Sequence, residues 1–178
     1  AGSHPGPASY RKGGPLTVTD ANLFLGRLVI SQFPKIFGKN GNEPLDGELV
    51  RSKFEELTYT INKDTGKNLS SEDVALGFLN IANVKMANSI RDITESRGYV
   101  TKSHTLVSFG GAGSQNCSAV ARNLDINKVV IHKYSSILSA YGIAKAKITY
   151  DLTEPYNSEF SNDALEKAQS TISDLKEK

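Results

Sequence analysis

The sequence predicts a helix-rich α/β fold with a short parallel sheet, and three features lead to that prediction. Residues 105–122, TLVSFGGAGSQNCSAVAR, run from an apolar, β-prone segment through a glycine-rich turn into a helix-compatible pattern. A second apolar run, NKVVIHK, occupies residues 127–133. Two strands joined by a helix form a right-handed βαβ unit, so these strands are expected to be buried and parallel. Two long amphipathic segments upstream account for most of the predicted helical residues.

The turn after the first strand consists mostly of small residues, at positions 110–113. Glycine reaches positive φ without a Cβ clash and lets the backbone approach a bound group. The helix that follows presents unpaired N–H groups and the positive end of its dipole, which suits a phosphate, a ribose or a carboxylate. A tight turn without any ligand explains the local pattern equally well. The Gly-x-Gly spacing is only a weak dinucleotide fingerprint, since Asn116 replaces its third glycine.

The first part of the chain predicts irregular backbone followed by a short helix. Glycine and proline interrupt residues 1–15, and residues 17–19 are expected to form a short strand. Asp20 is placed to be the N-cap of a helix over residues 21–28. A carboxylate there usually serves only as a cap. The functional alternative is that Asp20 faces an active cleft, which makes it the candidate catalytic residue.

Two longer helices are predicted after a surface excursion at residues 31–46. The first covers residues 46–62, and Ser70 starts the second, which continues to Arg97. The apolar positions expected to face the core are Leu49, Phe54, Leu57 and Ile61 in the first, and Ala75, Phe78, Leu79, Ala82, Met86, Ile90 and Ile93 in the second. Their spacing favours core positions for Phe78 and Met86 over a cofactor slot. Further helices are expected after Ser135 and over residues 162–178.

Composition excludes several classes of protein. The net charge of +2 gives no basic excess for nucleic acid or an anionic membrane, and no apolar run approaches the ~20 residues of a membrane span. The single cysteine, Cys117, excludes a disulfide framework and a cysteine-rich zinc site. His4, His104 and His132 lack metal-ligand spacing, so no metal site is expected, and His132 is interpreted as structural. A cytoplasmic protein fits these features.

Longer motifs resemble those of one family. PGPASYRKGGPLTVTDANLFLGRL, FPKIFG, RDITESRGY, FGGAGSQN and IHKYSSILSAYGIA occur in the order found in the hydantoinase A/5-oxoprolinase family, over residues 1–155. The chain is most similar to the eukaryotic ATP-dependent members. The resemblance therefore implies that residues 1–155 are the C-terminal part of a hydantoinase A/oxoprolinase domain and residues 156–178 a polar helical tail. It also implies that the AGSHPGPASY segment is native.

The family belongs to the actin-like, sugar-kinase-like (ribonuclease H-like) ATPases, so the resemblance implies ATP and Mg²⁺ as cofactors of a longer parent protein. Its members hydrolyse 5-oxo-L-proline to L-glutamate with ATP cleavage, within glutathione metabolism. The phosphate loops of such enzymes are absent here, so the chain resembles an internal segment that is inactive alone. The implied partners are the small-molecule substrate, the remainder of the parent chain and a second copy of the enzyme. The nucleotide-binding positions implied by FGGAGSQ are Gly110, Gly111, Ala112, Gly113, Ser114 and Gln115.

The chain departs from the family motifs at several positions. These are Ser9, Val84, Asn88, Ser89, Ser114, Asn116 and Lys147. Glutamate, arginine and histidine are usual where Val84, Asn88 and Asn116 stand, and all three are residue types that act on substrates. The departures leave one alternative to an enzyme segment, a catalytically impaired paralogue that acts as a binding or scaffold subunit. The Gly-x-Gly spacing of the loop leaves a second, a small dinucleotide-binding module.

Overall fold

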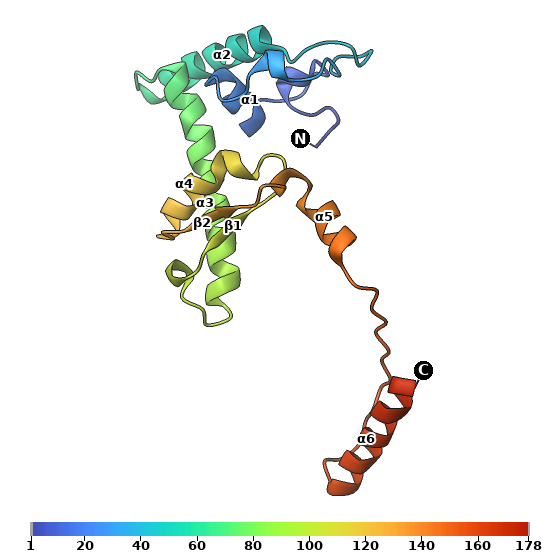
Figure 1. The fold of residues 1–178 in the computed structure, drawn as a ribbon. Helices are drawn as coiled ribbons and strands as arrows, with labels where there is room; N and C mark the ends of the chain where they lie inside the picture. The colour runs from blue at the N-terminus through green and yellow to red at the C-terminus, as the bar shows by residue number, and fades with distance from the viewer. Residues whose placement is uncertain (1, 178) are drawn as a thin grey trace. The chain divides into compact units, whose positions relative to one another are not determined.

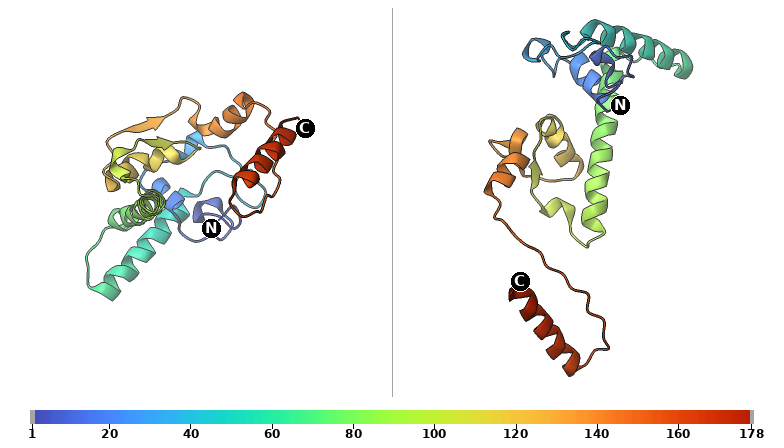
Figure 2. Two further views of the ribbon diagram at one scale, coloured as in Figure 1. Left: turned by 90° about the horizontal axis from the view of Figure 1, so that it is seen from below. Right: turned by 90° about the vertical axis from the view of Figure 1, so that its right-hand side faces the viewer.

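The computed structural model describes residues 2–177 and contains two compact units, Ala1–Ile137 and Leu138–Lys178. The elements of the first unit are helices α1 (Val18–Phe24), α2 (Gly47–Thr65), α3 (Ser71–Glu95) and α4 (Gly113–Asn123), strands β1 (Leu106–Ser108) and β2 (Val129–Ile131), and 3-10 turns at Ala8–Tyr10, Ile30–Gln32, Thr101–Ser103 and Ser135–Ile137. Figures 1 and 2 show α3 passing from α1 and α2 to the layer formed by α4 and the strands. The predicted helix-rich α/β fold is confirmed.

Side-chain caps fix where the first three helices begin. Ser70 caps α3, where the sequence predicted the start of that helix, and Asp46 caps α2, which begins one residue after the predicted start. The prediction for α1 was wrong, because Thr17 is its N-cap and residues 17–19 form no strand. Thr17 has an extended backbone, and its hydroxyl accepts the Asp20 N–H. Asp20 is the third helical residue, and its carboxylate completes a capping box, which satisfies two backbone N–H groups where a single N-cap satisfies one.

The first hydrophobic core lies between α1, α2 and the N-terminal half of α3. Phe54 is fully buried at its centre, and its ring centroid lies 5.0 Å from that of Phe24 and 5.5 Å from that of Phe78. The buried stripe of α2 is Val50, Phe54 and Thr58. The sequence prediction missed Val50 because it centred the apolar face on Leu57 and Ile61, which only flank this core.

The second core is formed by the C-terminal half of α3, helix α4 and the strands. Its buried members are Ala87, Val120, Ala121, Leu124 and Ile126. Ile93 was expected in the core but is 60% exposed, and Met86 is 37% exposed. The spacing did place them on the apolar side of α3. Ile90, which lies between them in the sequence, packs against this core, so Met86 and Ile93 lie at the margin of the covered side of α3.

The sheet consists of β1 and β2, which are parallel, with Leu106 opposite Val129. The predicted parallel pair is confirmed, although each strand has only three residues. The prediction of buried strands was wrong for one face. Leu106 and Val129 pack against the second core, whereas Val107 and Val130 alternate to the opposite face and are exposed.

The second unit contains α5 (Leu138–Lys145) and α6 (Asn162–Glu177). The Ser161 hydroxyl accepts the Ala164 N–H at 3.1 Å, and the Tyr156 hydroxyl donates to the Ala164 carbonyl at 3.0 Å. The expected helix after Ser135 is present, after a 3-10 turn, and the expected C-terminal helix is present over Asn162–Glu177; residue 178 lies outside the described residues. Among the described residues, no helix combines the length and apolar character needed to cross a bilayer.

Candidate functional site

The glycine loop, defined here as residues 109–113, connects β1 to α4. Strand β1 ends at Ser108 and α4 begins at Gly113. Gly110 has φ +89°, and its N–H donates to the Ser135 carbonyl at 2.8 Å. Ala112 occupies the N-cap position without a side-chain cap, so no side chain satisfies the first N–H groups of α4. The predicted sequence of strand, glycine loop and helix N-terminus is confirmed.

The structure explains the presence of glycine at two of the three glycine positions of the loop, for different reasons. Gly110 needs its positive φ, which L side chains rarely adopt. A Cβ at Gly113 would lie 2.7 Å from the Ser108 hydroxyl oxygen, so close packing inside the chain accounts for this glycine. Gly111 has neither constraint, because a Cβ there meets open space. Only Gly111 is therefore left without an explanation from the fold of this chain.

Helix α1 and the residues that follow it hold the first turn of α4 through Gln115. The Arg27 guanidinium Nη2 donates to the Gln115 carbonyl at 2.6 Å, and the Asn22 amide donates to Gln115 Oε1 at 3.5 Å. Asn22 is 2% exposed, and its Oδ1 has no partner among the described residues. Arg27 and Gln115 are separated by 88 residues in the sequence, and Asn22 and Gln115 by 93. No signal in the sequence indicated either contact.

Asp20 lies in the first turn of α1, and its side chain is fully buried. Its carboxylate accepts the N–H groups of Ala8, Ser9 and Thr17 at 3.1, 2.9 and 2.8 Å, and the Thr17 hydroxyl at 2.8 Å. Both carboxylate oxygens are occupied by these four donors, and the side chain is 0% exposed. In this chain Asp20 therefore ties residues 8–9 to the beginning of α1.

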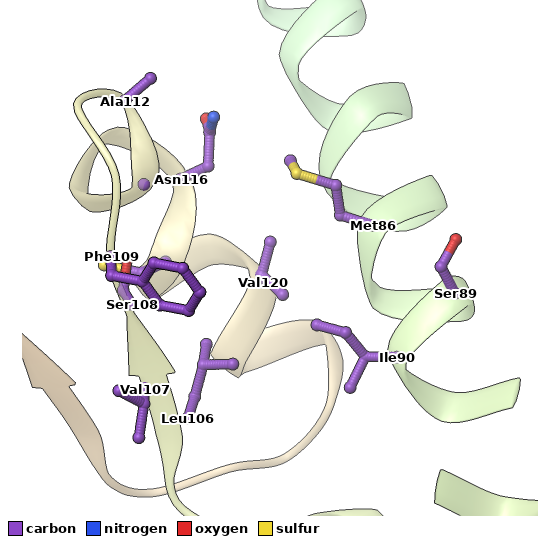
Figure 3. Close-up of a pocket in the computed structure, with 12 residues that line it drawn as sticks. Met86, Ser89, Ile90, Leu106, Val107, Ser108, Phe109, Ala112, Asn116 and Val120 are labelled. Atoms are coloured by element: carbon purple, nitrogen blue, oxygen red, sulfur yellow. The ribbon is translucent and has the colours of Figure 1, made fainter. Parts of the chain in front are cut away.

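A pocket of about 520 Å³ lies beside the glycine loop, between α3 and the layer of β1 and α4 (Figure 3). Its lining residues are Met86, Ser89, Ile90, Leu106, Val107, Ser108, Phe109, Ala112, Gly113, Asn116, Cys117 and Val120. The sequence prediction missed Met86 as a lining residue. Met86, Ser89 and Ile90 are spaced three and four residues apart, which was the available signal for a shared helix face.

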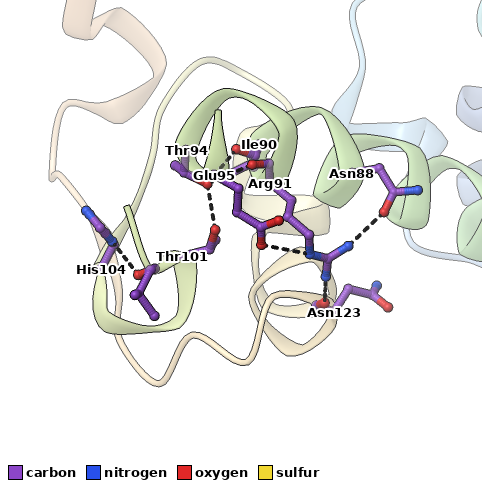
Figure 4. Close-up of polar contacts among 9 residues, drawn as sticks. Asn88, Ile90, Arg91, Thr94, Glu95, Thr101, His104 and Asn123 are labelled. Carbon is purple, nitrogen blue, oxygen red and sulfur yellow. Dashed lines mark hydrogen bonds and ion pairs between the residues drawn. The ribbon is translucent and has the colours of Figure 1, made fainter. Parts of the chain in front are cut away.

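Two departures from the family motifs lie at or near this pocket. Asn116 and Ser89 line it, and the Ser89 hydroxyl donates to the Lys85 carbonyl at 3.0 Å. Asn88 lies outside it and accepts a hydrogen bond from Arg91 at 2.9 Å. Figure 4 shows the same guanidinium donating to the Asn123 carbonyl, at 2.8 Å. Arg91 therefore connects α3 to the end of α4, where a positive charge is favourable.

Two of the three histidines, His104 and His132, take part in local contacts with the backbone. His132 Nδ1 accepts the Tyr134 N–H at 3.1 Å, and His104 Nδ1 lies 3.0 Å from the Val100 carbonyl oxygen. Within residues 2–177, no three His, Cys, Asp or Glu side chains are grouped so that they could hold a metal ion. Cys117 is buried, and its thiol donates to the Ser114 carbonyl at 3.4 Å.

Comparison with known proteins identifies a family model and several enzymes to which this chain is similar. The family model described as Hydantoinase/oxoprolinase matches residues 1–152. The chain belongs to the hydantoinase/oxoprolinase family. It is 54% identical over 178 residues to a 5-oxoprolinase of Pestalotiopsis fici, and 59% identical over 155 residues to the 5-oxoprolinase of Saccharomyces cerevisiae. These alignments cover 100% and 87% of this chain.

Two solved structures share its fold. The ATP-dependent caprolactamase of Pseudomonas jessenii matches with a TM-score of 0.67 and 31% identity over 99% of this chain. Nucleotide-free acetone carboxylase matches with a TM-score of 0.64 over 93% of this chain, at 24% identity, and shows likeness of fold alone. The chain spans 14% and 12% of the two 5-oxoprolinases and 25% of the caprolactamase chain. These relatives are thus much longer than this segment.

Proposed function

We propose that the chain is a segment of an ATP-dependent 5-oxoprolinase that hydrolyses 5-oxo-L-proline to L-glutamate with ATP cleavage. The observation that carries this proposal is the 54–59% identity to proteins named 5-oxoprolinase, which extends over most or all of the chain. An amide is a poor electrophile because its nitrogen donates into the carbonyl. Transfer of a phosphoryl group from ATP to the amide oxygen makes the ring carbonyl carbon more electrophilic, so that water can add to it. This is the chemical reason to couple the hydrolysis to ATP cleavage.

In this proposal the glycine loop and the first turn of α4 contact the nucleotide, through Gly110–Gln115, in a cleft of an actin-like, sugar-kinase-like ATPase. Three observations support the assignment. The first N–H groups of α4 have no side-chain cap, Gly111 opens onto free space, and Asn22 and Arg27 hold Gln115 in position. Unpaired N–H groups at a helix N-terminus are suited to the polar and anionic parts of a nucleotide.

Asp20 enters the proposal as a positioning residue, since four donors already occupy its carboxylate. The described residues do not fit a Mg²⁺ site, because no group of carboxylates converges among them. We therefore assign Mg²⁺ and the phosphate-binding loops to the remainder of a longer cytoplasmic enzyme. The segment alone is expected to release no phosphate from ATP, because phosphoryl transfer depends on that positioning.

Gly111 offers the test, because a Cβ added there meets no atom of the segment within 4 Å. In the full-length enzyme, Gly111→Val should raise the KM for ATP about tenfold or more, a loss of ~1.4 kcal/mol, by blocking the approach of the nucleotide. The KM for 5-oxoproline and the unfolding temperature should change little. Steady-state kinetics with each substrate varied in turn measures this.

Gly113→Val is the matched strain control, since its Cβ would meet Ser108. It should lower the unfolding temperature as well as the affinity for ATP. An unchanged KM for ATP in the Gly111→Val enzyme would disprove the nucleotide assignment, and the loop would then be a tight turn. Absence of any 5-oxoproline hydrolysis by the wild-type enzyme would instead disprove the proposed reaction.

A further inference from the structure

The chain turns sharply where α1 ends, and this turn brings Arg27 to α4. Gly26 has φ +70°, and its N–H donates to the Leu23 carbonyl at 3.1 Å. The Arg27 N–H donates to the Asn22 carbonyl at 2.8 Å. These two bonds, from the left-handed residue and from the residue after it, form a Schellman motif, which ends many helices. The motif fixes the backbone of Asn22 and Arg27, whose side chains both bond to Gln115.

The bonds to Gln115 hold the first turn of α4 without using its free N–H groups. An ordinary N-cap accepts a hydrogen bond from the second or third N–H of a helix, so it fixes the turn but occupies a donor. Ala112 provides no such cap. Arg27 bonds to the Gln115 carbonyl instead, and among the described residues the Gly113 and Ser114 N–H groups have no partner. A turn that would otherwise fray is thus held in shape while its donors stay available to a ligand.

Two arginines bond to backbone carbonyls of α4, at opposite ends of the helix. Arg91 bonds to the Asn123 carbonyl, at the end where the helix dipole favours a positive charge, and it also pairs with Glu95 at 3.7 Å. Arg27 lies at the other end, where the dipole disfavours a positive charge, and it forms no ion pair with any described residue. The stability of α4 therefore does not explain Arg27, whereas an anionic ligand at that end would make its charge favourable.

We propose that Arg27 is a positioning residue for the nucleotide, which acts by bonding to the Gln115 carbonyl and so fixing the first turn of α4. The proposal rests on the proposed function, since it takes the glycine loop and this turn as the nucleotide contacts. Asn22 supports the same turn from its buried side, where it is 2% exposed. Without the guanidinium the turn frays, and ATP must reorder it on binding at a cost in affinity.

Binding of the non-hydrolysable ATP analogue AMP-PNP to the full-length enzyme, measured by calorimetry, tests this proposal. Arg27→Ala should raise the dissociation constant about five- to tenfold, as expected for one exposed hydrogen bond to a charged donor. Arg27→Lys should recover most of the affinity, because an ammonium group also donates to a carbonyl. The KM for 5-oxoproline should stay within about twofold of the wild-type value. A lower unfolding temperature with an unchanged dissociation constant would mean that Arg27 is merely structural, and would overturn the proposal.

Arg91→Ala is the matched control, because it removes an arginine bond to the opposite end of the same helix. It should leave the dissociation constant of AMP-PNP within about twofold of wild type. Equal losses of affinity in Arg27→Ala and Arg91→Ala would contradict a specific role of the first turn.

Amide hydrogen exchange supplies a readout that does not depend on ligand binding. In the unliganded full-length enzyme, Arg27→Ala should speed exchange of the Gln115 and Asn116 amides about tenfold and leave that of Leu124 unchanged. Unchanged exchange at Gln115 would contradict the proposal even if affinity falls. If the wild-type enzyme hydrolyses 5-oxoproline and binds AMP-PNP but Arg27→Ala matches it in both assays, only the positioning role is disproved. Failure of the wild type to bind AMP-PNP would overturn the nucleotide assignment itself, and the positioning role with it.

Discussion

The two cores of the first unit differ in how completely this chain covers them. The first core, around Phe54, is enclosed by α1, α2 and α3, and its charged residue Asp20 has four hydrogen-bond donors. The second core, around Val120, has one sheet face and one strand edge uncovered, with Val107 and Phe109 exposed. The proposed nucleotide loop and the pocket beside it both adjoin the second core. The completely packed first core thus serves as scaffold, whereas the incompletely packed second core carries the surface that we propose to contact the nucleotide.

The largest expected effect comes from matched leucines in the two cores, Leu79 and Leu124, which are each 3% exposed. Leu79→Ala should cost about 3–5 kcal/mol of unfolding free energy, because the enclosed first core leaves a cavity that cannot collapse. Leu124→Ala should cost about 2 kcal/mol, because the open side of the second core lets its neighbours relax. Denaturant titration of the 178-residue chain measures both. A loss for Leu124→Ala that equals or exceeds that for Leu79→Ala would contradict the difference between the cores.

Asp20→Asn is expected to have the next largest effect. The amide retains one acceptor oxygen and turns a donor toward the backbone N–H groups of residues 8–9, so about 2–3 kcal/mol of stability should be lost. Thermal unfolding of the variant measures the loss. In the full-length enzyme, the turnover rate should fall only as far as the folded fraction falls. Near-complete loss of turnover in a variant whose unfolding is unchanged would show that Asp20 is catalytic.

The smallest expected effect concerns the capping box of α3. The Ser70 N–H and hydroxyl donate to the Asp73 carboxylate and hold the pKa of Asp73 below its ordinary value of 3.8. A carboxyl whose pKa is lowered by folding stabilises the native state above 3.8, and this stabilisation is lost as the pH falls through the lowered value. The stability difference between wild type and Asp73→Asn should therefore be constant from about pH 7 to about pH 5 and shrink below 3.8. Thermal unfolding over that range checks it, and a difference that grows on acidification would contradict the assignment.

Local signals predicted much of this fold. Gly110 and Gly113 marked the turn between β1 and α4, and Ser70 followed by Asp73 marked the start of α3. The same signal was present at Thr17 and Asp20, which have the spacing of a capping box, but it was interpreted as a single N-cap. Elements defined by residues a few positions apart were thus accessible to sequence reasoning, with errors of a few residues at their ends.

Features made by distant residues could not be predicted in this way. The contacts of Asn22 and Arg27 with Gln115 depend on how α1 and α4 pack, and no periodicity encodes them. Met86 has the spacing of a core residue, yet it lines a pocket and is 37% exposed. Apolar spacing identifies the side of a helix that needs covering, but it does not tell whether the cover lies in the same segment.

The continuity of α3 has a mechanical consequence. It belongs to both cores without interruption, and its 25 residues give it a length of about 37 Å. A tilt of about 5° around its N-terminal end would carry its C-terminal end through about 3 Å, by the geometry of a straight rod of that length. The bonds from Asn22 and Arg27 to Gln115 brace α1 against α4 at a second point beside the rod. Without these two hydrogen bonds, the tilt of α3 would be set by its side-chain packing alone.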